Sequence, residues 1–207
     1  MPFRGNIIER RRAILDLCGG TGAWSAPFRS LGYETYVVDV DGFHDPDFCM
    51  SVQTFLQKIR QDSIYLPPVD IVLAAPPCTH FTNASARLWP EYDRKGLTRQ
   101  SIDTVLTCLN IIDLLAPRAW ALENPRGRLR YFIGLPSWNF QPFLYGDPWS
   151  KETHIWGTAR KPTMTSRVQV LPMLARLGGK SAKVKTERSR TPPGFARAFA
   201  AENRRTW

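Results

Sequence analysis

Apolar residues occur along this chain in short runs that alternate with segments in which they recur at helical spacing. A run that is apolar on both faces predicts a buried strand, whereas apolar positions three and four apart predict a helix that packs by one face. The predicted strands span 13–17, 34–39, 69–75, 119–122, 140–145 and 154–156. The predicted helices span 23–31, 51–60 and 98–116, with a last helix opened by 191–194. Strands that alternate with helices predict an α/β fold with a doubly wound, largely parallel sheet and helices on both faces.

The third apolar run ends abruptly at Pro76 and Pro77, and the next residue is Cys78. Proline has no N–H to donate to a neighbouring strand, so the strand must end at Pro76 and leave Cys78 in the following loop. In open α/β sheets, ligands bind at the carboxyl ends of the strands. Cys78 is therefore either a thiol that acts on a substrate or a small apolar side chain packed in the core, the commonest fate of a free cysteine. Residues elsewhere in the chain favour the first interpretation.

Other strand ends carry residues suited to a nucleotide-type ligand. The first strand ends in a glycine-rich turn, 18–22, whose glycines let the backbone approach a ligand closely, although a simple tight connection would use the same residues. Asp39 ends the second strand about twenty residues on, where nucleotide-binding folds place an acid on the ribose hydroxyls. Glu123 follows the fourth strand. Because parallel strands end at one edge of a sheet, we expect the Glu123 carboxylate on the same edge as Cys78.

Residues 79–97 form a polar, partly basic segment without periodicity. Loops of this length are usually lids or binding loops, or else are disordered. Because the segment directly follows Cys78, we predict a lid that is mobile without substrate and closes over the site. In the next helix, the apolar positions and Cys108 predict core packing.

The charge of the chain points to its partner. Lys and Arg number 28 against 18 Asp and Glu, a formal net charge of +10, which favours a polyanion such as nucleic acid over a merely basic surface. Hydrophobic residues make up 43% and charged residues 22% of the 207 residues, as in a soluble globular domain. The four cysteines lie far apart, which argues against a zinc site or a disulfide framework and fits a reducing compartment. Since neither an apolar leader nor a run of membrane-spanning length is visible, we expect a cytoplasmic protein without membrane contact, and we favour a monomer.

In their order along the chain, these motifs resemble the DNA (cytosine-5)-methyltransferase family. The matching segments are 16–22, Pro76-Pro77-Cys78, Glu123-Asn124-Pro125 and, loosely, 188–195. The resemblance implies a Rossmann-like S-adenosylmethionine-dependent methyltransferase fold over residues 1–207, and transfer of a methyl group from S-adenosylmethionine to carbon 5 of cytosine in DNA. The same chemistry on RNA or on a free cytosine nucleotide is an alternative, and so is an inactive fold that only binds nucleic acid. The net charge speaks against the free nucleotide, and the presence of both Cys78 and Glu123 speaks against mere binding.

The resemblance also implies roles for single residues. Cys78 is expected to add as a thiolate to carbon 6 of cytosine and Glu123 to hydrogen-bond ring nitrogen 3, with Pro77 and Asn124 beside them in the catalytic set. The residues expected to bind the cofactor are Asp16, Cys18, Gly19, Gly20, Gly22, Asp39, Ser51 and Pro76. The residues expected to contact the substrate are Asn83, Ser85, Lys151 and Thr153. No metal is expected.

The chain departs from the family pattern in four places. The family usually has an aromatic ring where Cys18 stands and an acid near Ser51, both at the adenine. It has arginines in the strand that here begins at Lys151, so Lys151 or Thr153 is expected to substitute for them. Finally, only the basic segment 158–190 stands in place of a separate target-recognition domain, and it is too short to fold alone. Because Lys and Arg there would hold phosphates, we expect a short or degenerate recognition sequence.

Overall fold

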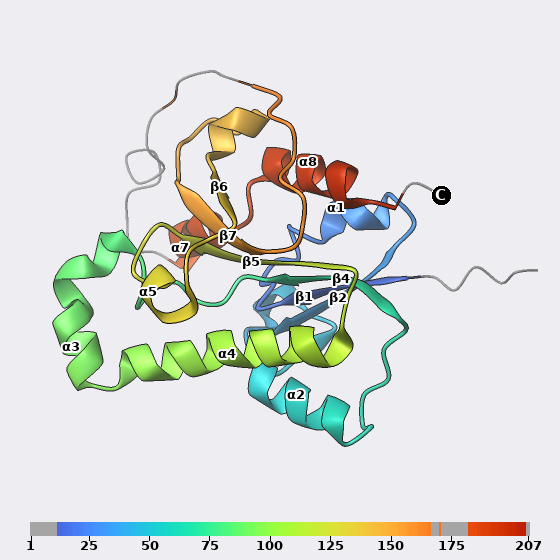
Figure 1. The fold of residues 1–207 in the computed structure, drawn as a ribbon, viewed down its shortest axis with the longest axis horizontal. Coiled ribbons are helices and arrows are strands. Elements are labelled where there is room, and N and C mark those ends of the chain that lie inside the picture. Colours follow the sequence, from blue (N-terminus) through green and yellow to red (C-terminus); the bar gives the residue numbers. More distant parts are fainter. Residues whose placement is uncertain (1–11, 167–169, 171–181, 206–207) are drawn as a thin grey trace, which may run out of the picture.

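Figure 1 shows the computed structural model, which describes residues 12–166, 170 and 182–205. Within these residues, seven strands form one sheet in the order β3-β2-β1-β4-β5-β7-β6. Strand β7 runs antiparallel to both of its neighbours, β5 and β6, and the other neighbouring strands are parallel. The strands are β1 (Ala13–Leu17), β2 (Glu34–Asp39), β3 (Phe48–Cys49), β4 (Val69–Ala74), β5 (Ala119–Pro125), β6 (Trp138–Phe140) and β7 (Thr153–Gly157).

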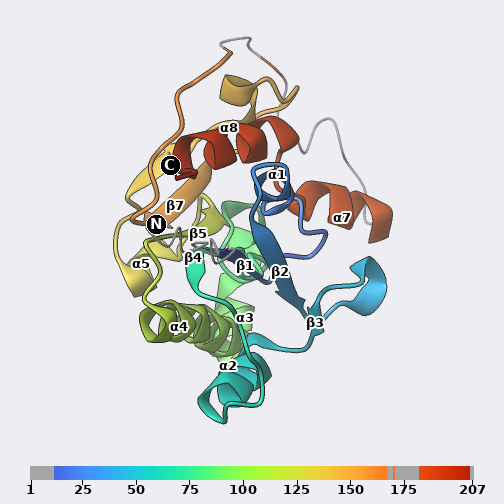
Figure 2. The ribbon, with the colours of Figure 1, turned by 90° about the vertical axis from the view of Figure 1, so that its right-hand side faces the viewer.

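Helices cover both faces of the sheet, which confirms the doubly wound α/β prediction. The α-helices are α1 (Ala26–Arg29), α2 (Val52–Arg60), α3 (Trp89–Arg94), α4 (Leu97–Leu115), α5 (Arg130–Ile133), α7 (Ala182–Ser189) and α8 (Pro193–Asn203). Three short 3₁₀ helices are η1 (Gly42–His44), η2 (Asn83–Leu88) and η3 (Pro142–Tyr145). Helices α1 and α8 lie above the sheet and α2 and α4 below it (Figures 1 and 2), while α3, α5 and α7 lie toward the left end of the sheet in Figure 1.

The central strand β4 is apolar from Ile71 to Ala74 because successive side chains enter two different cores. Ile71 and Leu73 pack into the core between the sheet and helices α1 and α8. Val72 and Ala74 pack into the core between the sheet and helices α2 and α4. All four side chains are fully buried. A strand covered on both faces cannot alternate apolar and polar residues, so its run of apolar positions predicted the correct structure.

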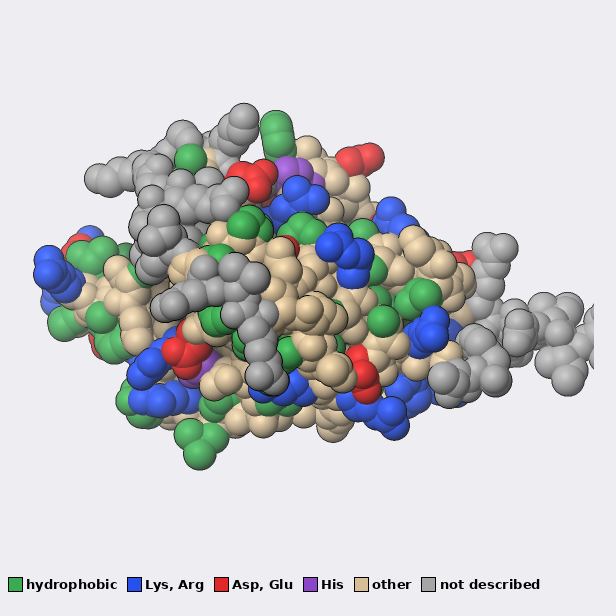
Figure 3. Space-filling view, turned by 90° about the horizontal axis from the view of Figure 1, so that it is seen from above, with side chains coloured by type: hydrophobic (Ala, Val, Ile, Leu, Met, Phe, Trp, Pro, Cys, Tyr) green, Lys and Arg blue, Asp and Glu red, His purple; other side chains and the backbone are tan. Residues whose placement is uncertain are grey.

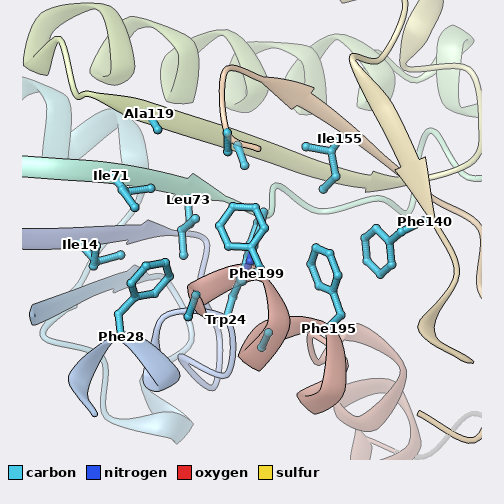
Figure 4. Close-up of a cluster of buried hydrophobic side chains, with 14 of the residues drawn as sticks. Ile14, Trp24, Phe28, Ile71, Leu73, Ala119, Phe140, Ile155, Phe195 and Phe199 are labelled. Carbon is cyan, nitrogen blue, oxygen red and sulfur yellow. The ribbon is translucent and has the colours of Figure 1, made fainter. Parts of the chain in front are cut away.

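Aromatic side chains form much of the core between the sheet and helices α1 and α8, shown in Figure 4. Phe195 of α8 stacks on Phe140 of β6, with ring centroids 3.6 Å apart and planes within 6°. One turn further along α8, Phe199 contacts Trp24 edge to face at 5.4 Å. The prediction that the last helix packs by one apolar face is confirmed, and this packing holds α8 on β4 and β6.

The segment 79–97 is not the aperiodic loop that its composition predicted. It contains η2 and α3, and the hydroxyl of Thr82 accepts a hydrogen bond from the Ala84 N–H at the start of η2. Pro90 stands in the first turn of α3, where a missing N–H costs nothing. Thr98 is not the cap of the next helix: α4 begins at Leu97 after Gly96, and Thr98 is buried.

Four further element boundaries differ from prediction. The region predicted as a strand over 140–145 has β6 ending at Phe140, because Pro142 opens η3 and cannot donate to a ladder. The helix predicted over 23–31 is limited to α1, since the glycine-rich turn extends to Ser25. Strand β3 is two residues long, too short for a periodic signal. Strand β5 continues through Pro125, so Glu123 and Asn124 lie within the strand. In the described part of the chain, no helix has both the length and the apolar composition needed to cross a membrane.

Candidate active site

A cavity of about 300 Å³ opens at the carboxyl edge of the parallel strands. It is bordered by the residues that end β1, β2 and β4, by the last part of β5, and by the residues that follow α7. The predicted site residues that line it are Asp16, Cys18, Gly19, Gly20, Asp39, Pro76, Pro77, Cys78, Glu123 and Lys151. The structure therefore brings the predicted thiol, the predicted carboxyl group and most of the predicted cofactor residues to one cavity.

Six predicted residues do not line this cavity. Ser51 lies in an adjoining cavity of about 220 Å³ that shares Cys18, Asp39 and Pro77 with the first. Gly22 lies further along the glycine-rich turn, and Asn124 lies behind the cavity wall. The remaining three are engaged or directed elsewhere: Asn83 is exposed, the Ser85 hydroxyl donates to the Thr79 carbonyl at 2.6 Å, and the buried Thr153 hydroxyl donates to the Lys151 carbonyl at 2.9 Å.

The glycine-rich turn is built for close approach. Gly20 has φ +51°, a left-handed conformation that favours glycine, and its N–H donates to Asp39 Oδ2 at 2.8 Å. A Cβ on Gly19 would lie 2.7 Å from Asp16 Cγ, so a side chain there would collide with the strand end. Asp39 Oδ1 accepts from the Asp41 N–H at 2.9 Å. Asp39 thus holds the turn and the following loop, as well as bordering the cavity.

Asp16 is the one predicted cofactor residue with an unmet bonding requirement. It is 1% exposed, and its Oδ2 accepts from the Ser25 hydroxyl at 2.7 Å. Its Oδ1 has no partner among the described residues. Burial raises the pKa of Asp16 to about 6, against the hydrogen bond from Ser25. A buried acceptor without a partner is costly, so this oxygen suits a ligand that brings a donor or a positive charge.

Cys18 occupies the position where the family usually has an aromatic ring. Its interaction with the nearby thiol of Cys108 on α4, together with burial, raises the pKa of Cys18 well above its usual value. Cys18 borders both cavities. A neutral thiol packed against α4 leaves a small, apolar wall where a larger ring would stand.

The other half of the cavity combines a thiol, a carboxyl group and an amine. Burial raises the pKa of Cys78, and the positive charge of Lys151 opposes that shift. Burial also raises the pKa of Glu123, whose side chain is 17% exposed, and Lys151 again opposes it. The Lys151 ammonium lies 4.0 Å from Glu123 Oε1 and donates to the Arg188 carbonyl at 3.2 Å. Raised pKa values mean that the neutral forms of Cys78 and Glu123 persist to higher pH than usual.

Asn124 ties these two strand ends together. It is fully buried, and its Nδ2 donates to the Pro76 carbonyl at 2.9 Å. Strands β4 and β5 are neighbours, with Ala74 paired to Leu122, so Cys78, which follows β4, and Glu123, near the end of β5, come from adjacent strands. The sequence-based expectation that the thiol and the carboxyl group share one edge is confirmed.

The cavity also has lining residues that the sequence did not single out. They are Thr21, Asp41, His44, Ala75, Thr79, Pro125, Ser189, Arg190 and Thr191. Asp41 and His44 come from the η1 region between β2 and β3, which has no periodic signal. Ser189 to Thr191 fall within the loosely matching motif 188–195, so that motif was the available signal for them.

Comparison with known proteins supports the same fold. No protein-family model matches the chain. The sequence is 27% identical over 131 residues to the type II methyltransferase M.AplI of Arthrospira platensis, a match that covers 59% of this chain and 34% of that relative. The chain thus spans about a third of the length of the curated relative that it matches.

Two solved structures are also similar. Methyltransferase EhMeth of Entamoeba histolytica superposes with a TM-score of 0.52 at 11% identity, over 84% of this chain and 62% of that one. A DNMT2 protein of Spodoptera frugiperda gives a TM-score of 0.44 at 18% identity, over 78% of this chain and 54% of that one. With the sheet order above, the superposition on EhMeth shows that the chain has a Rossmann-like methyltransferase fold.

Proposed function

We propose that this chain is an S-adenosylmethionine-dependent methyltransferase that acts on carbon 5 of cytosine in DNA. The observation that carries the proposal is that Cys78, Glu123 and the glycine-rich turn border one cavity. The sequence similarity to a protein named as a type II methyltransferase supports the reaction class. The substrate and the position of methylation rest on the thiol and the carboxyl group, because simple methyl transfer to an amine or hydroxyl needs neither in this arrangement.

The residues at the turn fit the proposed cofactor. Asp16 Oδ1, buried and without a partner among the described residues, suits the ammonium group of the methionine part. Asp39 borders the cavity where ribose hydroxyls would lie, and the adjoining cavity at Ser51 would take the adenine. S-adenosylmethionine, when bound, supplies an electrophilic methyl group on its sulfonium. Cys18 then contributes an apolar wall instead of a stacking ring.

Cys78 and Glu123 perform complementary steps on the cytosine ring. The Cys78 thiol loses its proton and adds to carbon 6, which makes carbon 5 nucleophilic. Burial raises the pKa of Glu123, and in its protonated form Glu123 donates a hydrogen bond to ring nitrogen 3 and stabilises the charge that the addition creates. Once carbon 5 carries the methyl group, loss of its proton lets the carbon–sulfur bond break and restores the aromatic ring. The Lys151 ammonium favours the ionised form of Cys78.

A base inside a duplex cannot reach this cavity, so the target cytosine would be flipped out or be presented single-stranded. Figure 3 shows Lys and Arg side chains spread across the side of the molecule that carries α8 rather than gathered in one patch. The net charge of +10 favours contacts with the phosphate backbone. Of the basic segment 158–190, residues 167–169 and 171–181 lie outside the described residues. Its proposed role in a short or degenerate recognition sequence stays a prediction.

The test is transfer of labelled methyl groups from S-adenosylmethionine to DNA, RNA and dCMP in parallel. We expect DNA to be labelled, with 5-methylcytosine as the product after digestion to nucleosides. DNA that contains 5-fluorocytosine should trap the protein covalently through Cys78, because fluorine cannot leave as a proton does. If RNA alone is labelled, the substrate is RNA instead of DNA and the proposed reaction on cytosine still holds. Product methylated on any atom other than carbon 5, or trapping at another residue, would contradict the proposal.

A further inference from the structure

Arg128 is a buried guanidinium that joins three segments near the cavity. Its side chain is 9% exposed. Its Nε donates to the His80 carbonyl at 3.0 Å, one terminal nitrogen donates to Asp93 Oδ2 at 2.9 Å, and the other donates to the Thr98 hydroxyl at 2.7 Å. These partners come from the loop after β4, from α3 and from α4. A planar guanidinium suits such an arrangement because its donors diverge in a fixed geometry.

The backbone beside Arg128 is paired with the segment that follows Cys78. The Asn83 N–H donates to the Arg126 carbonyl at 3.2 Å, and the Arg128 N–H donates to the Phe81 carbonyl at 2.9 Å. Gly127 lies between these two bonds, and a Cβ on it would be 2.0 Å from the Phe81 carbonyl oxygen. The two chain segments can approach this closely only because residue 127 is glycine.

This pairing reaches Cys78 in one further step. The N–H groups of Phe81 and Thr82 both donate to the Cys78 carbonyl, each at 2.9 Å. Arg128 itself lies five residues beyond Glu123, on the chain that leaves β5. A continuous set of hydrogen bonds therefore connects the loop that carries the thiol to the segment that follows the carboxyl group.

The same guanidinium holds α3 in place. Its Cζ lies 4.8 Å from the centroid of the Trp89 ring, a cation–π contact, and Asp93 Oδ1 accepts from the Thr98 hydroxyl at 2.5 Å. The hydrogen bond from Arg128 is the largest cause of the lowered pKa of Asp93, and the hydrogen bond from Thr98 is the next. Figure 1 shows α3 beside the amino end of α4, with α5 close to both. The segment predicted to be a lid is thus bound at several points along its length.

We propose that Arg128 is a positioning residue that keeps residues 79–98 docked before any substrate binds, so that Cys78 and Glu123 face the same cavity in the free protein. This segment, which borders the cavity at Thr79, is then fixed beside the cavity and does not close as a lid. The catalytic consequence rests on the proposed function, whereas the docking itself does not.

The first test measures docking without nucleic acid, in the full-length protein. Two variants loosen the clamp, Asp93→Asn and Arg128→Lys. Glu91→Gln is the matched control because Glu91 lies on the same helix as Asp93 and its carboxylate forms an ion pair with the exposed Lys95. Trypsin can cut the segment after Arg87, Arg94 and Lys95, and iodoacetamide can label Cys78, with both products identified by mass spectrometry. We expect both variants to be cut and labelled about tenfold faster than wild type, and the control within about twofold.

Circular dichroism and thermal unfolding show whether each variant folds. Asp93 is half exposed, with 52% of its side chain accessible, so Asp93→Asn tests the clamp even where Arg128→Lys does not fold. Unchanged cutting and labelling in a folded Asp93→Asn protein would overturn the proposal. So would wild-type protein whose segment is cut rapidly without DNA and protected about tenfold by it, since that is the behaviour of a lid.

The second test measures catalysis. In both variants we expect kcat to fall at least about tenfold while the KM for S-adenosylmethionine stays within about twofold, because the clamp holds the thiol and touches none of the cofactor residues. Arg128→Lys should not rescue kcat, since one ammonium cannot reach three partners. An equal change in the KM for S-adenosylmethionine would contradict a positioning role. If the wild-type protein transfers no methyl group to any nucleic acid, the proposed function fails, and the cutting and labelling rates still support or overturn the docking.

Discussion

Two aspartates of this sheet, Asp16 and Asp70, are each 1% exposed, yet their surroundings are opposite. Asp70 lies near the amino end of β4 and accepts from Arg205 at 2.7 Å, Arg118 at 3.0 Å and Arg12 at 3.5 Å. Asp16 lies near the carboxyl end of β1, and one of its oxygens has no partner among the described residues. The Asp70 carboxylate thus has all its hydrogen bonds from side chains of the protein, whereas one Asp16 oxygen can still accept a hydrogen bond. Equal burial therefore goes with a fully bonded carboxylate at one edge and an incompletely bonded one at the other, where we propose that the ligand binds.

Among substitutions at the carboxyl edge of the sheet, that of Cys78 should cause the largest loss of methyl transfer. Cys78→Ser replaces a soft thiol with a hydroxyl that adds poorly to carbon 6, so we expect methyl transfer to fall by about 10⁴-fold or more and covalent trapping by 5-fluorocytosine DNA to be lost. The unfolding free energy should change little. Cys49→Ser is the control, because Cys49 is exposed and lies outside the cavity. A stable adduct in Cys78→Ser would assign the nucleophile to another residue.

Glu123→Gln should have the next largest effect. Glutamine keeps the shape of the side chain but donates a weaker hydrogen bond to ring nitrogen 3, and general acid catalysis contributes about 10²–10⁴-fold. We expect kcat to fall within that range while affinity for S-adenosylmethionine is retained, which steady-state kinetics and calorimetry would measure. Turnover equal to that of wild type would remove Glu123 from the mechanism.

Asp16→Asn should change how the free energy of unfolding depends on pH. The pKa of Asp16 is about 6 in the folded protein, above its value of 3.8 when unfolded, so the unfolded state loses this proton first as pH rises. The contribution of this carboxyl group to the free energy of unfolding is therefore complete below pH 3.8 and is lost as pH rises through 6. The loss amounts to about 3 kcal/mol. We expect Asp16→Asn to lose this dependence in urea unfolding between pH 4 and pH 8. Wild type and variant with parallel stability curves would show that the carboxyl group is not held in this state.

Asp70→Asn should lower the free energy of unfolding without changing activity. This is the smallest of the expected effects. It leaves three guanidinium groups without their common carboxylate, but each of them is about a third exposed, so water screens part of the loss. We expect the unfolding free energy to fall by about 2 kcal/mol, with methyl transfer and cofactor affinity unchanged in the fraction that remains folded. Loss of cofactor binding in folded Asp70→Asn protein would erase the distinction between the two edges.

The fold and the centre of the candidate site followed from short local signals. Pro76 and Pro77 end a strand whatever surrounds them, and the turn at Gly19 and Gly20 needs glycine for reasons of backbone geometry alone. Because parallel strands end at one edge, the position of Cys78 in the sequence was enough to place it near Glu123. The error over 79–97 arose because distant contacts decide the structure of that segment, which has no helical pattern of its own.

What the sequence by itself determined is therefore the sheet, its two apolar cores and the residues that its strands deliver to one edge, because apolar periodicity, proline and glycine act within a few residues. Only the tertiary structure decided which of those residues remain without a partner, as Asp16 does, and which are saturated, as Asp70 is. It also decided that Arg128 reaches back to His80, Asp93 and Thr98, residues 30 to 48 positions away. Hydrogen bonds and ion pairs between distant segments depend on how those segments are packed, and no local pattern encodes that distance.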